Sequence, residues 1–149
     1  MALTHAELLA LANEHVRCEI AQDVDGVLAT LEDDTFYDIH PLGVRFSGRD
    51  AVRRYYEWLF TSFGPRQVRT ELIGTYVGDE GVVFENRLWF TRDDGSIACH
   101  DLIGIDVAGT TRLKGEKIFG HPELIEAMVG PLLREAKPIE WLQDDRRLV

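Results

Sequence analysis

The spacing of hydrophobic residues divides the 149-residue chain into a helical first part and a strand-rich second part. Apolar residues recur about every 3.6 positions after Thr4 and again over 48–63, which predicts two amphipathic helices. Thr4 stands three residues before Glu7, the spacing of a capping box at a helix N-terminus. A shorter helix is expected over 24–31 and an extended segment over 35–40.

Beyond the third predicted helix the hydrophobic period changes to two, which is typical of strands with one buried face. Turns rich in glycine and aspartate separate four expected strands, at about 66–77, 82–92, 96–107 and 111–119. A last amphipathic segment follows Gly120. Helices that precede a run of strands predict an α+β fold. We expect a curved antiparallel sheet packed on three helices, which together form a cone with a cavity for a small molecule.

Composition adds limits on size and partners. The chain is 45% hydrophobic and 28% charged, as in globular proteins, and we expect one domain over 1–149 with a C-terminal helical extension over about 121–149. A formal net charge of −10 argues against nucleic acid and membrane surfaces as partners. The sequence shows neither a basic leader nor the ~20 apolar residues of a membrane-spanning helix. We therefore expect a cytoplasmic protein in which Cys18 and Cys99 are reduced.

Several common catalytic motifs are absent from the sequence. It contains no CxxC, HExxH, GxGxxG, P-loop or GxSxG pattern. No sequence motif therefore supports metal-dependent hydrolysis, nucleotide binding or serine hydrolase chemistry. We expect neither a metal ion nor a cofactor.

The predicted strand over 96–107 carries one candidate for chemistry. A single carboxylate interrupts the apolar row on one of its faces, which reads Ile97, Cys99, Asp101, Ile103, Ile105. A carboxylate removed from water needs a partner or a shifted pKa, and shifted pKa values are common among functional acids. A structural aspartate that bonds a helix N-terminus or a buried arginine is the alternative.

Histidines and one tyrosine supply further candidates. His40 ends the extended segment just before Pro41, and an ordinary pKa of about 6.5 suits it to general acid–base catalysis; an exposed loop histidine is the alternative. His15 and Glu19 lie within the apolar arc of the first helix, where a lone histidine is more often a hydrogen-bonded core residue. The hydroxyl of Tyr56 needs a polar partner if it is buried.

In order and spacing, these segments resemble the NTF2-like superfamily, in its SnoaL-like and ketosteroid-isomerase-like branch. Six stretches carry the resemblance, at 23–29, 32–34, 40–43, 47–56, 100–105 and 117–120. The resemblance implies a cone-shaped α+β barrel with a deep apolar cavity. It also implies a homodimer that forms through the outer face of the sheet.

The same resemblance implies roles for four residues. His40 stands where the family has an aspartate base, and Asp101 where it has a protonated aspartate donor. His15 falls at the position of the oxyanion tyrosine, and Tyr56 at that of a supporting tyrosine. Because histidine replaces both the base and the donor tyrosine, the resemblance implies proton transfer on a small apolar molecule and not steroid isomerisation itself.

The sequence thus predicts a small-molecule-binding SnoaL-like protein, and we hypothesise an acid–base enzyme of isomerase, dehydratase or cyclase type. His40 is the expected base, and Asp101 orients it or donates a proton. Five residues are expected to contact an apolar or aromatic substrate: His15, Tyr56, Trp58, Trp89, Phe119. A second copy of the chain is the other expected partner. The alternative function is a non-catalytic module for ligand binding or dimerisation.

Overall fold

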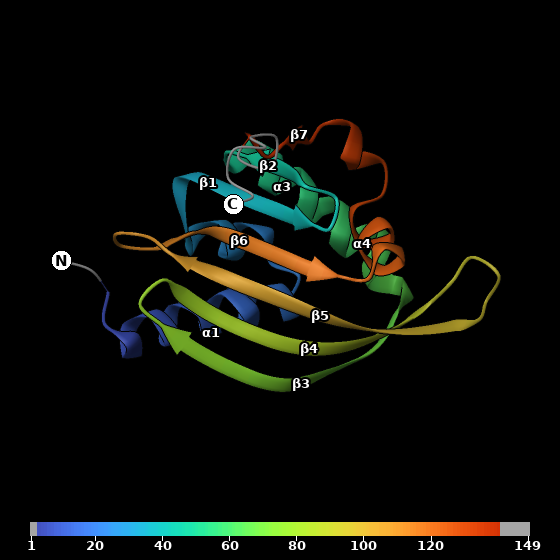
Figure 1. Ribbon diagram of the computed structural model, residues 1–149, viewed down its shortest axis with the longest axis horizontal. Helices are drawn as coiled ribbons and strands as arrows, with labels where there is room; N and C mark the ends of the chain where they lie inside the picture. The colour runs from blue at the N-terminus through green and yellow to red at the C-terminus, as the bar shows by residue number, and fades with distance from the viewer. Residues whose placement is uncertain (1–2, 141–149) are drawn as a thin grey trace, which may run out of the picture.

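The computed structural model describes residues 3–140 and shows a curved sheet with helices packed against it (Figure 1). The α-helices are α1 (His5–Ile20), α2 (Val24–Ala29), α3 (Arg49–Trp58) and α4 (Pro122–Val129). The strands are β1 (Leu31–His40), β2 (Val44–Ser47), β3 (Gln67–Gly78), β4 (Gly81–Thr91), β5 (Ile97–Ala108), β6 (Leu113–Gly120) and β7 (Lys137–Pro138). Three short helical turns complete the list: η1 (Leu59–Phe63), η2 (Gly64–Arg66) and η3 (Gly130–Arg134).

The predicted capping box starts α1. The Thr4 hydroxyl accepts the Glu7 backbone N–H, and the Glu7 carboxylate accepts the Thr4 backbone N–H at 2.9 Å. Both bonds satisfy amide groups that a helix N-terminus leaves without a partner. Of the predicted arc, the helix buries Leu8, Ala12, Cys18 and also His15, which is 1% exposed, whereas Ile20 at its end is 80% exposed. The capping box therefore fixes where α1 begins, and the spacing of its apolar residues decides which face meets the sheet.

The sheet has the strand order β3-β4-β5-β6-β1-β2-β7. Strands β3 to β6 form the predicted antiparallel run, and each lies within two residues of its expected bounds. Strand β1 pairs with β6 in parallel, so the sheet is mixed and not wholly antiparallel as expected. The sheet stays open between β3 and β7, and α1, α2 and α3 pack against strands of its inner face.

Two boundaries differ from the expected ones. Helix α2 ends at Ala29, and β1 already begins at Leu31, where Leu113 is its partner on β6. The third helix changes to a π-helical turn at Leu59, so the expected helix over 48–63 is two elements. Hydrophobic spacing is similar in α- and π-turns, so the sequence pattern does not separate them.

The C-terminal part returns to the sheet. After α4 and η3, the short strand β7 pairs with β2, which makes this segment an edge of the sheet and not only a helical extension. The part of that extension over 141–149 lies outside the described residues. Among residues 3–140, none of the helices has the length and apolar character needed to cross a membrane. Cys18 and Cys99 are both free thiols, as expected.

Candidate functional site

A cavity of about 700 Å³ lies between α1, η1 and the inner face of the sheet. This volume is within the range of small-molecule sites, about 300–1,000 Å³. Most of its wall is apolar, from side chains of Val16, Leu59, Phe60, Phe63, Phe84, Leu88, Leu102, Ile118 and Met128. The cavity is therefore suited to an apolar or aromatic molecule.

Three carboxyl groups from three elements also line this cavity: Glu19 of α1, Asp106 of β5 and Glu116 of β6. Asp106 and Glu116 are direct cross-strand partners, so their side chains share the inner face of the sheet. Asp106 is 3% exposed, and its Oδ2 atom has no hydrogen-bond partner among the described residues. Glycine at 104 keeps space beside Glu116, because a β-carbon there would lie 2.6 Å from Glu116 Oε1.

Burial shifts the titration of all three carboxyls. It raises the pKa of Asp106 and of Glu116 well above the ordinary values, and repulsion from the Glu19 charge adds to this. Burial raises the pKa of Glu19 to about 7, partly offset by a hydrogen bond from Tyr56. Burial therefore favours the protonated forms of Asp106 and Glu116, which can donate hydrogen bonds. Glu19 exchanges its proton readily near neutral pH.

Behind Glu19 lies a hydrogen-bonded cluster of aromatic residues. The Tyr56 hydroxyl donates to Glu19 Oε1 at 2.7 Å and lies 2.6 Å from the Tyr37 hydroxyl. His15 Nε2 lies 3.0 Å from the Tyr56 hydroxyl and 3.2 Å from that of Tyr37. His15 Nδ1 lies 2.6 Å from the Thr30 hydroxyl. All these groups come from α1, β1, α3 and the end of α2, so packing of the helices on the sheet assembles the cluster.

Donors and acceptors in this cluster can be assigned by starting from the Thr30 hydroxyl and from the protonation state of His15. The Thr30 hydroxyl donates to the Val27 carbonyl at 2.6 Å, so it accepts the proton of His15 Nδ1. Burial lowers the pKa of His15 to about 4, so the imidazole is neutral and Nε2 is an acceptor. The 3.6 Å contact between His15 and Glu19 is therefore not an ion pair at neutral pH.

With these assignments, the polar groups of the cluster keep their hydrogen-bond partners whether Glu19 is ionised or protonated. When Glu19 is ionised, it accepts the Tyr56 proton, and Tyr37 donates to His15 Nε2. When Glu19 is protonated, it donates to the Tyr56 oxygen, and Tyr56 donates onward to Tyr37 or His15. The cluster therefore stabilises Glu19 as a base and as an acid, which is what reversible proton transfer requires.

One group of potential metal ligands lies in this site. Single ligand atoms of His15, Asp106 and Glu116 lie within 4.8 Å of one another. However, both ring nitrogens of His15 already have hydrogen-bond partners: the Thr30 hydroxyl at Nδ1, and the hydroxyls of Tyr37 and Tyr56 at Nε2. The donor set fits a proton network better than it fits a metal centre.

The comparisons with known proteins agree with this architecture. A family model of the SnoaL-like domain matches residues 12–121. The chain belongs to the SnoaL-like family. No curated protein matches this SnoaL-like chain.

Solved structures share the fold of this SnoaL-like protein at low sequence identity. A proposed SnoaL-like polyketide cyclase from Jannaschia sp. CCS1 is 15% identical, with 81% of this chain and 92% of that chain covered and a TM-score of 0.64. A proposed isomerase from Bacillus subtilis is 12% identical, with 86% and 96% covered and a TM-score of 0.65. An NTF2-like protein of unknown function from Burkholderia pseudomallei K96243 is 16% identical, with 86% and 100% covered and a TM-score of 0.65. These TM-scores show that the fold is shared.

The structure places the expected base, His40, outside the cavity wall. His40 lies on the face of β1 opposite to Tyr37, where its ring stacks on Phe119 with centroids 4.3 Å apart. Partial burial lowers the pKa of His40. Phe119, expected to contact substrate, is 39% exposed on this same outer side. The catalytic role of His40 stays a prediction, and the cavity residues described above do not depend on it.

Asp101 is also on the outer face of the sheet, so its expected burial is wrong. It is exposed and forms an ion pair with Arg87, with Nε and Oδ1 2.7 Å apart. This arginine lowers the pKa of Asp101. An arginine partner is the structural alternative considered for this residue, although Arg87 is exposed and not buried. Because His40 and Asp101 both lie outside the cavity wall, the structure does not bring them together at the carboxyl cluster.

The other expected contact residues divide into two groups. His15 and Tyr56 are buried beside the cavity and meet each other and Glu19, as described above. Trp58 packs against Gly130 at the end of α4, and Trp89 lies under Arg69 with 4.6 Å between guanidinium and ring centroid. Neither tryptophan is among the residues that line the cavity.

Sequence reasoning missed Asp106, Glu116 and Tyr37 as site residues, and it placed Glu19 on the apolar arc of α1 without giving it a role. A signal for Asp106 existed, because it shares the second face of its strand with Gly104. That face was not expected to point inward, since the other face is richer in isoleucine. In the structure, Ala98, Gly104 and Asp106 are buried, while Ile97 is 58% exposed. The strand pattern alone predicts two faces but does not say which one faces the cavity.

Proposed function

We propose that this SnoaL-like protein binds an apolar or aromatic small molecule that carries a carbonyl oxygen, and transfers a proton on it. One observation carries the proposal: Glu19, with a pKa of about 7, shares the cavity with two more buried carboxyls, Asp106 and Glu116, whose pKa values burial also raises. Pairs of acids with separated pKa values in one site are typical of acid–base enzymes.

In the proposed reaction, the substrate oxygen accepts hydrogen bonds from the protonated carboxyls of Asp106 and Glu116. The ionised carboxylate of Glu19 removes a proton from the carbon next to the carbonyl. Negative charge then develops on the oxygen, where fixed donors in an apolar cavity stabilise it more effectively than water would. Return of the proton from Glu19 to another carbon gives isomerisation, and its transfer to a leaving hydroxyl gives dehydration.

Tyr56, Tyr37 and His15 act through Glu19 in this scheme and are positioning residues. Their hydrogen bonds hold the Glu19 carboxyl toward the cavity and support both of its protonation states. The exposed apolar side chains Ile20 and Leu72 stand at the mouth of the cavity, 80% and 58% exposed. They favour an apolar body for the ligand that extends toward the opening.

Exchange of ketone α-protons for solvent deuterium tests the proposal without knowledge of the natural substrate. The probe is 2-tetralone, a cyclic ketone fused to an aromatic ring, and its α-protons are followed by proton NMR in deuterated buffer. The wild type is expected to accelerate exchange above the buffer rate, and Glu19→Gln is expected to lose this acceleration. Glu126→Gln removes an exposed carboxylate of α4 and is the matched control.

The same experiment separates the alternative function. If 2-tetralone binds in the cavity but neither the wild type nor Glu126→Gln accelerates exchange, the protein is a non-catalytic ligand-binding module. If Glu19→Gln exchanges as fast as the wild type, the assignment of Glu19 as the base is wrong.

A homodimer remains part of the proposal. The outer face of the sheet exposes Ile97, Ile103 and Phe119, at 58%, 38% and 39%. Apolar side chains of this size on one face favour association with a second copy of the chain. Light scattering after size exclusion tests this: the proposal expects twice the 16.9 kDa chain mass, and a monomer mass at micromolar concentration contradicts it.

A further inference from the structure

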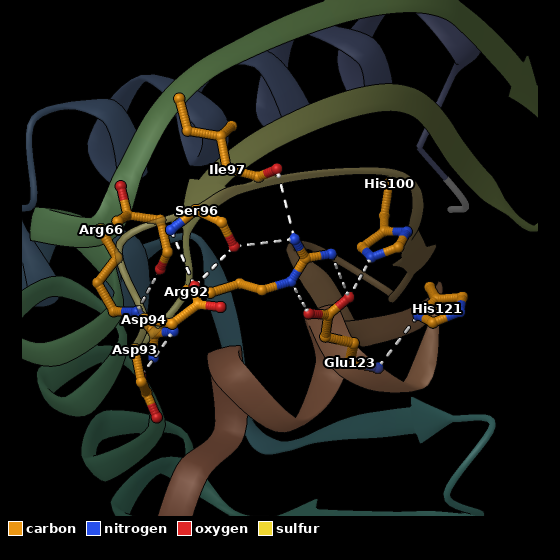
Figure 2. Close-up of polar contacts among 10 residues, drawn as sticks. Arg66, Arg92, Asp93, Asp94, Ser96, Ile97, His100, His121 and Glu123 are labelled. Carbon is orange, nitrogen blue, oxygen red and sulfur yellow. Dashed lines mark hydrogen bonds and ion pairs between the residues drawn. The ribbon is translucent and has the colours of Figure 1, made fainter.

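A second cluster of histidines and a carboxylate lies where β5 meets α4 (Figure 2). His100 belongs to β5, His121 is the N-cap residue of α4, and Glu123 lies in the first turn of α4. None of the three lines the cavity. The cluster is therefore separate from the proposed catalytic site, although α4 also supplies Met128 to the cavity wall.

The ligand atoms of the three side chains lie close to one another, although the two stacked rings do not yet point at a common centre. One ligand atom from each lies within 4.8 Å of the other two. His100 Nε2 and Glu123 Oε2 are 2.7 Å apart, and the two imidazole rings are stacked with centroids 4.1 Å apart. His121 Nδ1 accepts the backbone N–H of Glu123 at 3.3 Å, a long bond that leaves this nitrogen weakly held.

A metal ion of the size of zinc fits after small movements. Zinc takes nitrogen and carboxylate oxygen at about 2.0–2.2 Å in tetrahedral geometry, which places two ligand atoms about 3.4 Å apart. The pair formed by His100 and Glu123 must open by less than about 1 Å from its present 2.7 Å. His121 is exposed, so its ring can rotate out of the stack to direct a nitrogen at the ion.

Arg92 holds the Glu123 carboxylate through both of its oxygens. Its Nε donates to Oε1 and its Nη2 donates to Oε2 at 3.3 Å. Its Nη1 donates to Ser96 Oγ at 3.2 Å and to the Ile97 carbonyl at 3.5 Å, as Figure 2 shows. The carboxylate is thereby oriented with Oε2 toward His100. Hydrogen-bonded partners of this kind orient the ligands of many metal sites. The positive charge of Arg92 also repels a cation. We therefore expect a dissociation constant in the micromolar range and not tighter binding.

We propose that His100, His121 and Glu123 bind a divalent transition-metal ion of the zinc class. Imidazole and carboxylate are ligands that zinc accepts, and three protein ligands leave a fourth position for water. The bound ion would link α4 to the first part of β5 and so hold the helix that contributes Met128 to the cavity wall. The absence of a sequence motif follows from the topology, because the ligands come from a strand and from a helix after the next strand.

Isothermal titration calorimetry of the full chain with zinc chloride, after removal of metal with a chelator, tests the site. The wild type is expected to bind one equivalent. His100→Gln, which can still accept or donate toward Glu123, and His121→Ala are each expected to weaken binding by at least about tenfold. Cobalt(II) in place of zinc is expected to give the visible absorption of a tetrahedral site.

Two controls make the result specific. His5 forms a comparable surface pair with Asp79, with 2.8 Å between Nε2 and Oδ1, so His5→Ala is expected to leave zinc binding unchanged. Asp106→Asn alters the other ligand group, in the cavity, and is also expected to leave it unchanged. No measurable binding by the wild type overturns the proposal, as does a loss in either control equal to that in His121→Ala.

Discussion

Replacement of Glu19 by glutamine should reveal the energetic consequence of a buried acid in the cavity. Burial raises the pKa of Glu19 from an ordinary value of 4.5 to about 7. Between these pH values the folded protein holds a proton that the unfolded chain has released. The stability linked to this group is therefore fully present below pH 4.5 and is lost as pH rises through about 7.

The size of the effect follows from the two pKa values. Each pH unit corresponds to about 1.36 kcal/mol, so the interval from 4.5 to about 7 corresponds to about 3 kcal/mol. The Glu19 side chain is 30% exposed, so this figure is an upper value. Glutamine does not ionise. Glu19→Gln should therefore gain stability relative to the wild type as pH rises, by up to about 3 kcal/mol between acid and alkaline conditions.

Urea unfolding of both proteins at pH 4.5 and pH 8 measures this difference. The expected result is a free energy of unfolding for Glu19→Gln that is close to the wild type at pH 4.5 and clearly higher at pH 8. Glu126→Gln, an exposed change on α4, should show no such pH dependence relative to the wild type. A constant difference between wild type and Glu19→Gln, or a wild type that gains stability with pH, refutes the reasoning.

Three further variants test separate parts of the site. Tyr56→Phe removes a hydrogen bond that lowers the pKa of Glu19, so carbon-13 NMR of labelled glutamate should show that pKa above 7, and a fall would contradict the assignment. Gly104→Ala places a β-carbon 2.6 Å from Glu116 Oε1, so the Glu116 carboxyl must move. Calorimetry should then show about tenfold weaker 2-tetralone binding, equivalent to about 1.4 kcal/mol, with the fold retained. Asp101→Asn changes an exposed pair and should leave both the urea midpoint and ketone exchange at wild-type values; loss of exchange would restore its predicted catalytic role.

The elements that local chemistry defines were predictable. The capping box at Thr4 and the glycine- and aspartate-rich turns after β3 and β4 are short-range signals, and the structure confirms the elements they separate. The start of β1 was not predictable in this way. Its first residues include Asp33 and Asp34, which look like a helix end in the sequence, but pairing of Leu31 with Leu113 makes them part of a strand.

The site was only partly predictable, because it is assembled from distant segments. His15 and Tyr56 were selected on the apolar arc of a helix and by the family resemblance, and both contact Glu19 through the hydrogen-bonded cluster. The cross-strand pair of Asp106 and Glu116 depends on the register of β5 against β6, which a single sequence does not determine. Alternation along β5 led to Asp101 instead, since it does not state which face turns inward.

His40 was predicted to lie in the cavity, and it does not line the cavity for a similar reason. Its position before Pro41 fits the resemblance, but side chains of a strand alternate between faces. Tyr37 occupies the inner face of β1, so a residue three positions later lies on the outer face, beside Phe119. One position along a strand therefore decides between the cavity and the outer surface of the sheet.

The central claim is that a ligand oxygen meets Asp106 and Glu116 while its reacting carbon faces Glu19. A crystal structure of the protein with 2-tetralone tests this most directly. The account predicts the ketone oxygen within about 3.2 Å of a carboxyl oxygen of Asp106 or Glu116, and the adjacent carbon next to the Glu19 carboxylate. A ketone whose oxygen points to the cavity mouth, or one bound on the outer face beside His40, would contradict it.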